Sequence, residues 1–121
     1  MVPGDLVLAK RRSAQLAQLA QLPFISFHPS QREHGIQVAA LRKQGVEPSR
    51  VISSTGTESI LGFVEAGLGF SIVPWPSRSG PERRGVRCIR QAGADATFPI
   101  SAVWKRQDSP SHAVQAALAA L

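Results

Sequence analysis

The amino-acid sequence predicts an α/β fold, in which a mainly parallel sheet is flanked by helices. Short apolar stretches alternate with amphipathic stretches over residues 24–73, and strands that alternate with helices in this way build parallel sheets. Residues 30–33 and 55–58 read Ser-Gln-Arg-Glu and Thr-Gly-Thr-Glu, which is the capping-box pattern of a helix start. Gly45 and Gly67 follow where each of these helices would stop.

The first part of the chain is expected to form two short elements before the main α/β unit. A brief apolar run predicts a strand over residues 6–9. Three leucines spaced by three residues predict a short amphipathic helix over residues 13–22. Pro23 ends this helix, and residues 24–27 then form a compact apolar strand.

The middle of the chain is expected to hold two helices with a strand between them. The first helix starts at Ser30 and runs to about Lys43, a strand covers residues 50–53, and the second helix runs from Thr55 to Gly67. The apolar positions of both helices are expected in the core; they are Ile36, Val38, Ala40, Leu41, Ile60, Leu61, Val64 and Leu68.

The remaining elements follow the second helix. Residues 69–73 show little polar alternation, which predicts a strand covered on both faces. Residues 76–85 are rich in Ser, Pro, Gly and Arg and are expected to form a surface loop. Two more strands are expected over 86–89 and 98–104, and Ser109 and Pro110 then start a final helix that runs to Leu121.

The composition limits the class of protein. A length of 121 residues fits one domain, and no apolar run approaches the roughly 18 residues that span a bilayer. The single cysteine, Cys88, forms no internal disulfide, and no signal peptide precedes it, so we expect a cytoplasmic protein without membrane contact. The three histidines lack the spacing of a metal site, and neither a metal nor a cofactor is expected.

The net charge of +6 raises the question of nucleic-acid binding. The positive charges are dispersed in small clusters at residues 10–12, 83–84 and 105–106, and no expected helix carries a basic stripe. The chain has no tyrosine, and neither tryptophan has the neighbours of a base-stacking platform. The pattern therefore favours an ordinary solvated basic surface over direct DNA binding.

Three expected strand ends form the candidate binding site. Ligands of open α/β sheets bind beyond the carboxyl ends of the strands, which here are residues 26–30, 53–57 and 73–75. The first two lead into helix starts, whose free N–H groups favour a carboxylate or phosphate. Phe27 and Trp75 would wall such a pocket.

Each of these residues also has a purely structural interpretation. Residues such as Ser30 and Thr55 are more often plain helix caps than ligand contacts. Trp75 is equally explained as a core plug or a surface wedge. His28 is explained as a polar residue at a strand end, because no nucleophile or carboxylate accompanies it in the sequence. Only the convergence of the three segments supports a binding site.

Signals of catalysis are missing from the sequence. It has no Gly-x-Ser-x-Gly motif, no phosphate loop, no Cys/His pair in register and no paired carboxylates near a strand end. Glu58 and Glu65 lie on one expected helix, where capping and solvation explain them. We therefore expect a protein that is not an enzyme.

Three segments resemble one protein family. Residues 60–74, Ile-Leu-Gly-Phe-Val-Glu-Ala-Gly-Leu-Gly-Phe-Ser-Ile-Val-Pro, resemble a helix–strand segment of the effector-binding domain of LysR-type transcriptional regulators. Residues 22–25 resemble an earlier strand of that domain, and residues 98–105 resemble a late strand followed by its terminal helix. The resemblance spans nearly the whole chain, in the right order.

The resemblance implies a fold like that of type II periplasmic binding proteins, in which two α/β lobes hold an effector between them. Residues 1–121 would form a single partial effector-binding domain, in which residues 24–86 are the second lobe. Residues 5–23 and 87–121 would be crossover strands and remnants of an incomplete first lobe. The helix-turn-helix of such regulators and the front half of the first lobe have no counterpart in this chain.

The resemblance also implies a function. The chain would be the small-molecule effector-binding portion of a regulator, it would form homo-oligomers, and DNA would be bound only through a helix-turn-helix that this chain lacks. The alternative is a stand-alone solute-binding or ligand-sensing half-domain that acts through a partner chain. The effector would be a small anion of the carboxylate class, and the contacts implied by the family are Phe27, His28, Pro29, Ser30, Ser54, Thr55 and Thr57.

Overall fold

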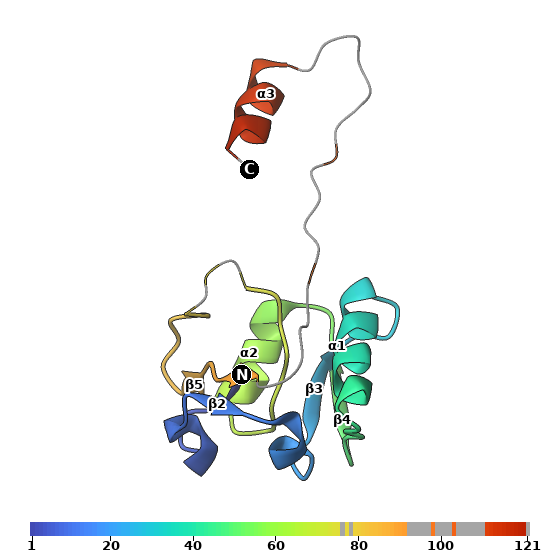
Figure 1. The fold of residues 1–121 in the computed structure, drawn as a ribbon, viewed down its shortest axis with the longest axis vertical. Helices are drawn as coiled ribbons and strands as arrows, with labels where there is room; N and C mark the ends of the chain where they lie inside the picture. The colour runs from blue at the N-terminus through green and yellow to red at the C-terminus, as the bar shows by residue number, and fades with distance from the viewer. Residues whose placement is uncertain (76, 78, 92–97, 99–102, 104–110, 121) are drawn as a thin grey trace.

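The computed structural model describes residues 1–75, 77, 79–91, 98, 103 and 111–120. Figure 1 shows the arrangement of the helices and strands. In chain order they are β1 (Val2–Pro3), η1 (Val7–Lys10), β2 (Ser13–Ala14), η2 (Leu16–Leu19), β3 (Phe24–Phe27), α1 (Arg32–Lys43), β4 (Val51–Ser54), α2 (Thr57–Glu65), β5 (Val86–Arg87), β6 (Arg90–Gln91) and α3 (His112–Ala119); η1 and η2 are 3-10 helices.

The main sheet is assembled from two short ladders and the segment that joins them. β3 and β4 are parallel, and β1 and β5 are antiparallel. Residues 70–72, called the central segment below, lie between the two ladders. Phe70 forms a parallel bridge with Phe24 of β3. On the other side Ser71 N donates to Met1 O at 3.0 Å, and the Met1 amino group donates to Ser71 O at 2.6 Å. Hydrogen bonds therefore connect β4, β3, the central segment, β1 and β5 in that order.

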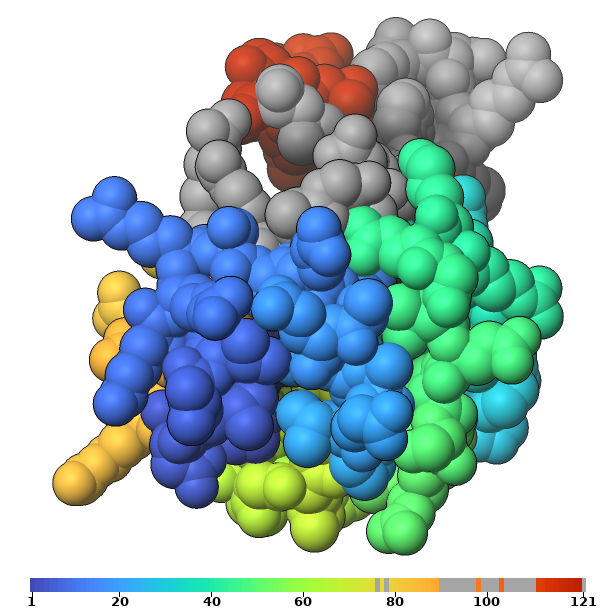
Figure 2. Space-filling model, turned by 60° about the horizontal axis from the view of Figure 1, so that its bottom comes forward, coloured from blue at the N-terminus to red at the C-terminus, as the bar shows by residue number. Residues whose placement is uncertain are grey.

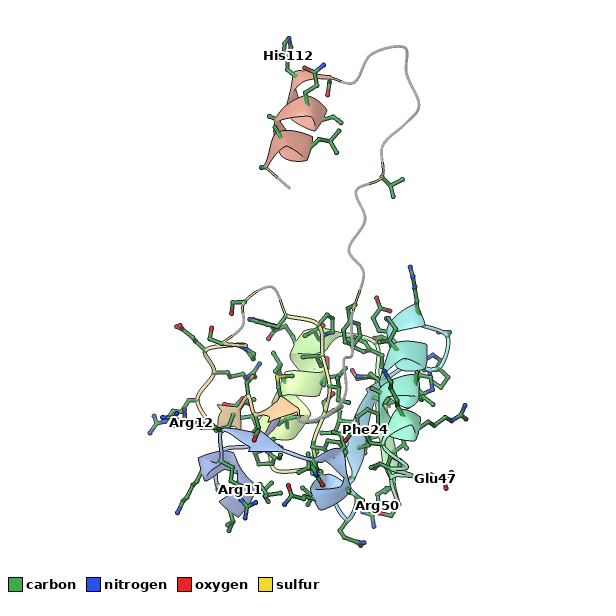
Figure 3. The ribbon with its side chains drawn as sticks, viewed as in Figure 1. Arg11, Arg12, Phe24, Glu47, Arg50 and His112 are labelled. Carbon is green, nitrogen blue, oxygen red and sulfur yellow. The ribbon has the colours of Figure 1, made fainter. Side chains whose placement is uncertain are left out.

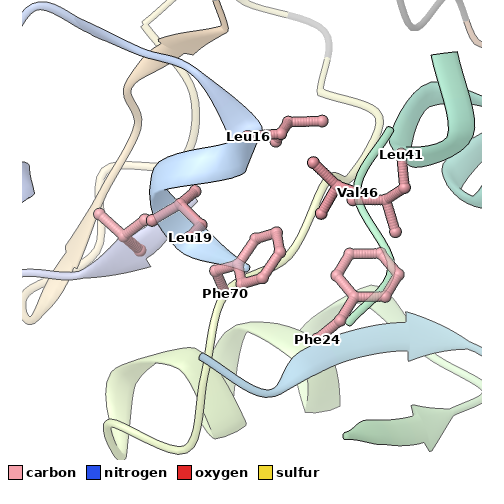
Figure 4. Close-up of a cluster of buried hydrophobic side chains, with 7 residues drawn as sticks. Leu16, Leu19, Phe24, Leu41, Val46 and Phe70 are labelled. Atoms are coloured by element: carbon pink, nitrogen blue, oxygen red, sulfur yellow. The ribbon is translucent and has the colours of Figure 1, made fainter. Parts of the chain in front are cut away.

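The two faces of β3 are covered by different helices, because successive side chains of a strand point in opposite directions. Phe24 packs with Leu41 of α1 and with Phe70. The ring centroids of Phe24 and Phe70 are 5.2 Å apart. Ile25 and Phe27 pack on the other face, against α2. All four residues of β3 are buried as a result. Figure 4 shows the α1-side cluster, which includes Leu16, Leu19, Phe24, Leu41, Val46 and Phe70.

The central α/β unit agrees with the sequence prediction. β3 covers the four predicted residues, and α1 ends at Lys43 as expected. Gly45 and Gly67 have φ angles of 64° and 77°, so both helices stop at a glycine in the left-handed region. β4 is shifted by one residue relative to the prediction.

Both helices begin differently from the prediction, and neither has a capping box. The N-cap of α1 is Gln31, and that of α2 is Gly56; neither helix receives a hydrogen bond from a capping side chain. Ser30 instead contacts the ring of His28, with Ser30 Oγ 2.8 Å from His28 Nδ1. The local pattern predicted the correct turn but the wrong cap, because the strand-end contacts compete for the side-chain oxygen.

The first part of the chain also differs from its prediction. The expected strand over residues 6–9 is wrong, since Val7–Lys10 is a 3-10 helix in which no residue is buried. The expected helix over residues 13–22 is replaced by β2 and η2. β2 pairs in parallel with β6, which was not predicted as a separate strand. These short elements gain their structure from distant partners, which a local pattern does not contain.

Other expectations are confirmed only in part. Residues 69–73 contribute a single bridge to the sheet instead of a full strand, and Leu68 is 46% exposed. The strand expected over residues 98–104 lies almost wholly outside the described residues, as do Ser109 and Pro110. The final helix, α3, covers His112–Ala119. Its N-cap is Ser111, whose side chain accepts a hydrogen bond from Val114 N. None of the helices in the described residues is long and apolar enough to cross a bilayer.

A shallow hollow lies at one end of the domain. It has a volume of about 420 Å³ and is lined by residues of η2, the end of α1 and the loop after it. Figure 3 shows Glu47 and Arg50 at this end, away from the starts of α1 and α2, and Figure 2 views the domain from this side, with the N-terminal segment beside residues of the α1–β4 region. The lining residues are Ala17, Ala20, Arg42, Gly45, Val46 and Glu47.

Candidate functional site

The carboxyl ends of β3 and β4 lie side by side at the opposite end of the domain. Phe27 and Ser54 are paired at the end of the ladder, and His28 N donates to Ser54 O at 2.9 Å. The chain leaves β3 for α1 and leaves β4 for α2, and both helices start at this end (Figure 1). Two of the three predicted strand ends are therefore brought together.

Gln31 joins these two strand ends. Its Nε2 donates to Thr55 O at 3.0 Å, and its Oε1 accepts from His28 N at 3.2 Å. His28 Nδ1 lies 2.8 Å from Ser30 Oγ. The turn after β3 and the turn after β4 thus form one hydrogen-bonded group, in which His28, Ser30 and Thr55 are all exposed.

The start of α2 lacks a side-chain cap. Gly56 occupies the N-cap position. The N–H groups of the first turn carry the positive end of the helix dipole. Glu58 lies in this first turn, but its carboxylate is paired with Arg83, at 3.0 Å from Arg83 Nη1, which offsets its negative charge.

The predicted site residues differ in what they present. The Phe27 side chain is 4% exposed and packs in the cluster that holds the buried residues of α2. Phe27 therefore offers the site mainly its backbone. Ser54 and Thr57 are half-buried, and His28 and Pro29 are exposed. Trp75 is 38% exposed; among the described residues, the hydrogen bonds that join the two strand ends do not include it.

A group of buried polar side chains lies beneath the site and was missed by the sequence reasoning. Gln37 and Ser26 are 0% exposed and Ser71 is 1% exposed. Ser26 Oγ lies 2.6 Å from His34 Nδ1 and donates to Gln37 Oε1 at 3.1 Å. A signal was present, because Gln37 precedes the buried Leu41 by four residues and so shares its face of α1.

The described part of the chain contains no cluster of three or more His, Cys, Asp or Glu side chains that could hold a metal ion. The groups present at the strand ends are hydroxyls, backbone N–H groups, amides and one imidazole. Such groups bind by hydrogen bonding and charge and suit the recognition of a small polar anion.

Comparison with known proteins gives a consistent result. Residues 1–121 match the model of the LysR substrate binding domain. The chain is 29% identical, over 117 residues, to the uncharacterized HTH-type transcriptional regulator YnfL of Escherichia coli (strain K12); the match covers 95% of this chain and 39% of YnfL.

Two solved structures from Pseudomonas aeruginosa show the same fold. The PA01 protein, assigned to the LysR family of transcriptional regulators, is 23% identical with a TM-score of 0.64, and the match covers 79% of this chain and 34% of PA01. HinK, a LysR family transcriptional regulator, is 23% identical with a TM-score of 0.62, with coverage of 77% and 32%.

This chain therefore spans only between 32% and 39% of the length of these relatives. The likeness confirms the predicted fold class, an α/β architecture related to type II periplasmic binding proteins. Because the family model covers the chain from its first to its last residue, the chain belongs to the LysR substrate-binding domain family.

Proposed function

We propose that this chain is the effector-binding portion of a LysR-type transcriptional regulator, and that its strand-end site binds a small anion of the carboxylate class. The observation that carries this proposal is the uncapped start of α2 beside the turn that holds His28 and Ser30. A carboxylate placed there would accept hydrogen bonds from backbone N–H groups of α2, from the Thr57 hydroxyl and from the His28 imidazole. Family membership favours this function over that of a half-domain acting through a different partner chain.

The site supplies one wall of a crevice. We propose that residues 24–86 are the second lobe and that residues 5–23 and 87–121 are crossover strands and remnants of the first lobe. The part of the first lobe that has no counterpart in this chain would provide the opposite wall. An effector that binds the closed arrangement better than the open one would shift the population toward closure. That shift would reach DNA through a helix-turn-helix domain outside this chain.

Two partner proposals accompany this function. Self-association of the domain is proposed from its family, and size-exclusion chromatography with light scattering tests it. Direct DNA binding by this chain is expected to be weak and non-specific, because its positive charge is dispersed over the surface. Fluorescence anisotropy with a labelled duplex at two salt concentrations tests that expectation.

The effector proposal is tested by ligand binding to the gene product that contains this chain. Acetate, succinate, benzoate and inorganic phosphate are titrated, with thermal shift and calorimetry as readouts. We expect at least one carboxylate to bind and His28→Ala to weaken its affinity by about fivefold, which is the loss of one modest hydrogen bond. His112→Ala is the matched control, since His112 lies on α3 (Figure 3). Equal affinities for His28→Ala and wild type, or binding of none of the four anions, would contradict the proposal.

A further inference from the structure

The parallel ladder between β3 and the central segment is regular at one position and then interrupted. Phe70 N donates to Pro23 O at 3.0 Å, and Ile25 N donates to Phe70 O at 2.8 Å. Continuation of a parallel ladder would next join Ile72 N to Ile25 O and Phe27 N to Ile72 O. In the structure, side chains supply the partners of three of these four groups, Ile25 O, Phe27 N and Ile72 O.

The side-chain amide of Gln37 replaces the bond between Phe27 N and Ile72 O. Gln37 Oε1 accepts from Phe27 N at 2.9 Å, and Gln37 Nε2 donates to Ile72 O at 2.6 Å. The neighbouring carbonyl of Ile25 accepts from Ser71 Oγ at 2.6 Å. A planar amide therefore lies between the two strands at the position where their backbones would otherwise meet.

Gln37 is held firmly in this position. Its side chain is 0% exposed, and Ser26 Oγ donates a further hydrogen bond to Oε1 at 3.1 Å. Burial of an amide is costly unless its groups are paired, and here the oxygen accepts two hydrogen bonds and the nitrogen donates one. This arrangement differs from that of an ordinary surface glutamine on a helix.

The amide also occupies a particular place in the sheet. The connection from β3 through α1 leads to β4 on one side, and the connection from β4 through α2 leads to the central segment on the other side. The strand order thus reverses between β3 and the central segment. Ligands of open α/β sheets bind in the crevice at such a reversal, beyond the carboxyl ends of the strands.

We propose that Gln37 is a positioning residue that holds the carboxyl ends of β3 and the central segment apart and so sets the width of the effector crevice. The inference rests on the effector site proposed above. Without the amide, Phe27 N is able to bond directly to Ile72 O. That bond would draw His28 toward Val73 and narrow the crevice from below.

The test uses two substitutions of Gln37 in the gene product that contains this chain. Gln37→Ala frees the space between the strands, and Gln37→Met keeps the side-chain length without the amide and serves if Gln37→Ala fails to fold. Val46→Ala is the control, because Val46 is buried on the same face of the sheet but lines the hollow at the other end of the domain. Binding is measured at a temperature at which every variant is folded.

The first readout is the affinity for succinate and benzoate. We expect either Gln37 substitution to weaken binding at least tenfold, while Val46→Ala binds within twofold of wild type in spite of its lower thermal stability. Wild-type affinity in a folded Gln37 variant would overturn the inference. A loss of the same size in Val46→Ala would also overturn it, because general destabilisation would then explain both.

The second readout needs no ligand and separates this inference from the proposed function. Amide hydrogen exchange reports the environment of Phe27 N directly, since its acceptor is Gln37 Oε1. We expect exchange at Phe27 to be at least tenfold faster in Gln37→Met, whose side chain fills the space between the strands without offering an acceptor, and to stay unchanged in Val46→Ala. If wild type binds none of the anions, the effector proposal fails. The exchange result then decides the inference alone, and unchanged exchange in Gln37→Met overturns it.

Discussion

Substitution of Gly69 by alanine is expected to disrupt the junction between β3 and the central segment. A Cβ at this position would overlap the carbonyl oxygen of Pro23 and would lie 2.9 Å from its carbonyl carbon. The backbone would have to move, and the adjacent hydrogen bond from Phe70 N to Pro23 O, 3.0 Å long, would be lost or lengthened. Steric overpacking costs about 1–3 kcal/mol, and one hydrogen bond contributes about 1 kcal/mol.

The expected loss in the free energy of unfolding is therefore about 2–4 kcal/mol, which corresponds to a decrease in Tm of roughly 8–16 °C for a domain of this size. Urea denaturation followed by far-UV circular dichroism measures it. Gly35→Ala is the matched control, because a Cβ at Gly35 meets nothing within 4 Å and the residue lies inside α1; it should stabilise by about 0.5–1 kcal/mol. A Gly69→Ala variant within about 0.5 kcal/mol of wild type, the range of ordinary surface substitutions, would refute the reasoning.

Three further predictions concern the helix stop, the surface charges and the amino group. Gly45→Ala should lower the free energy of unfolding in urea by about 1 kcal/mol, because Gly45 has a φ of 64° that disfavours a Cβ. An unchanged free energy of unfolding would contradict backbone strain at this helix end. Arg83→Met should cost at most about 1 kcal/mol, since its pairs with Glu58 and Glu65 are partly exposed, and the difference from wild type should shrink in 1 M NaCl. Burial lowers the pKa of the Met1 amino group below its usual value of 8.0, so the neutral form is favoured in the folded state. For a polypeptide whose first residue is Met1, this contribution to the free energy of unfolding should be fully present above pH 8 and should be lost as the pH falls through the folded-state pKa. A version extended upstream has an amide at this position and should lack this pH dependence. Identical pH profiles of the two versions would contradict the burial of a neutral Met1 amino group.

The central α/β unit could be predicted because its signals are local. Three of the four residues 24–27 are apolar. The segment is bounded by Pro23 on one side and by polar residues on the other, which leaves a strand as the simplest conformation. Gly45 and Gly67 mark helix ends because a positive φ is easily adopted only by glycine. The strand ends that form the candidate site followed directly from these boundaries.

Other features depend on contacts between distant residues and could not be read from the local pattern. β1 exists because Val2 and Pro3 pair with residues near position 86, and the strand over residues 6–9 was predicted in its place. Ser30 and Thr55 have the sequence of helix caps, but neither caps its helix, and Gln31 makes the contacts that join the two turns. A buried glutamine is also unexpected from hydropathy, since its burial depends on partners from two other segments, β3 and residues 70–72.

The position of Met1 in the sheet has a consequence for synthesis on the ribosome. Met1 pairs with Ser71, which is 70 residues later in the chain, and β1 pairs on its other edge with β5. β1 therefore leaves the ribosome long before either of these two neighbours. β3, α1 and β4 are contiguous and are able to assemble in that time, because nearby contacts have a small loop-closure cost. During translation β1 thus waits for both of these neighbours, and an apolar strand in that state is open to chaperones and to pairing with another nascent chain.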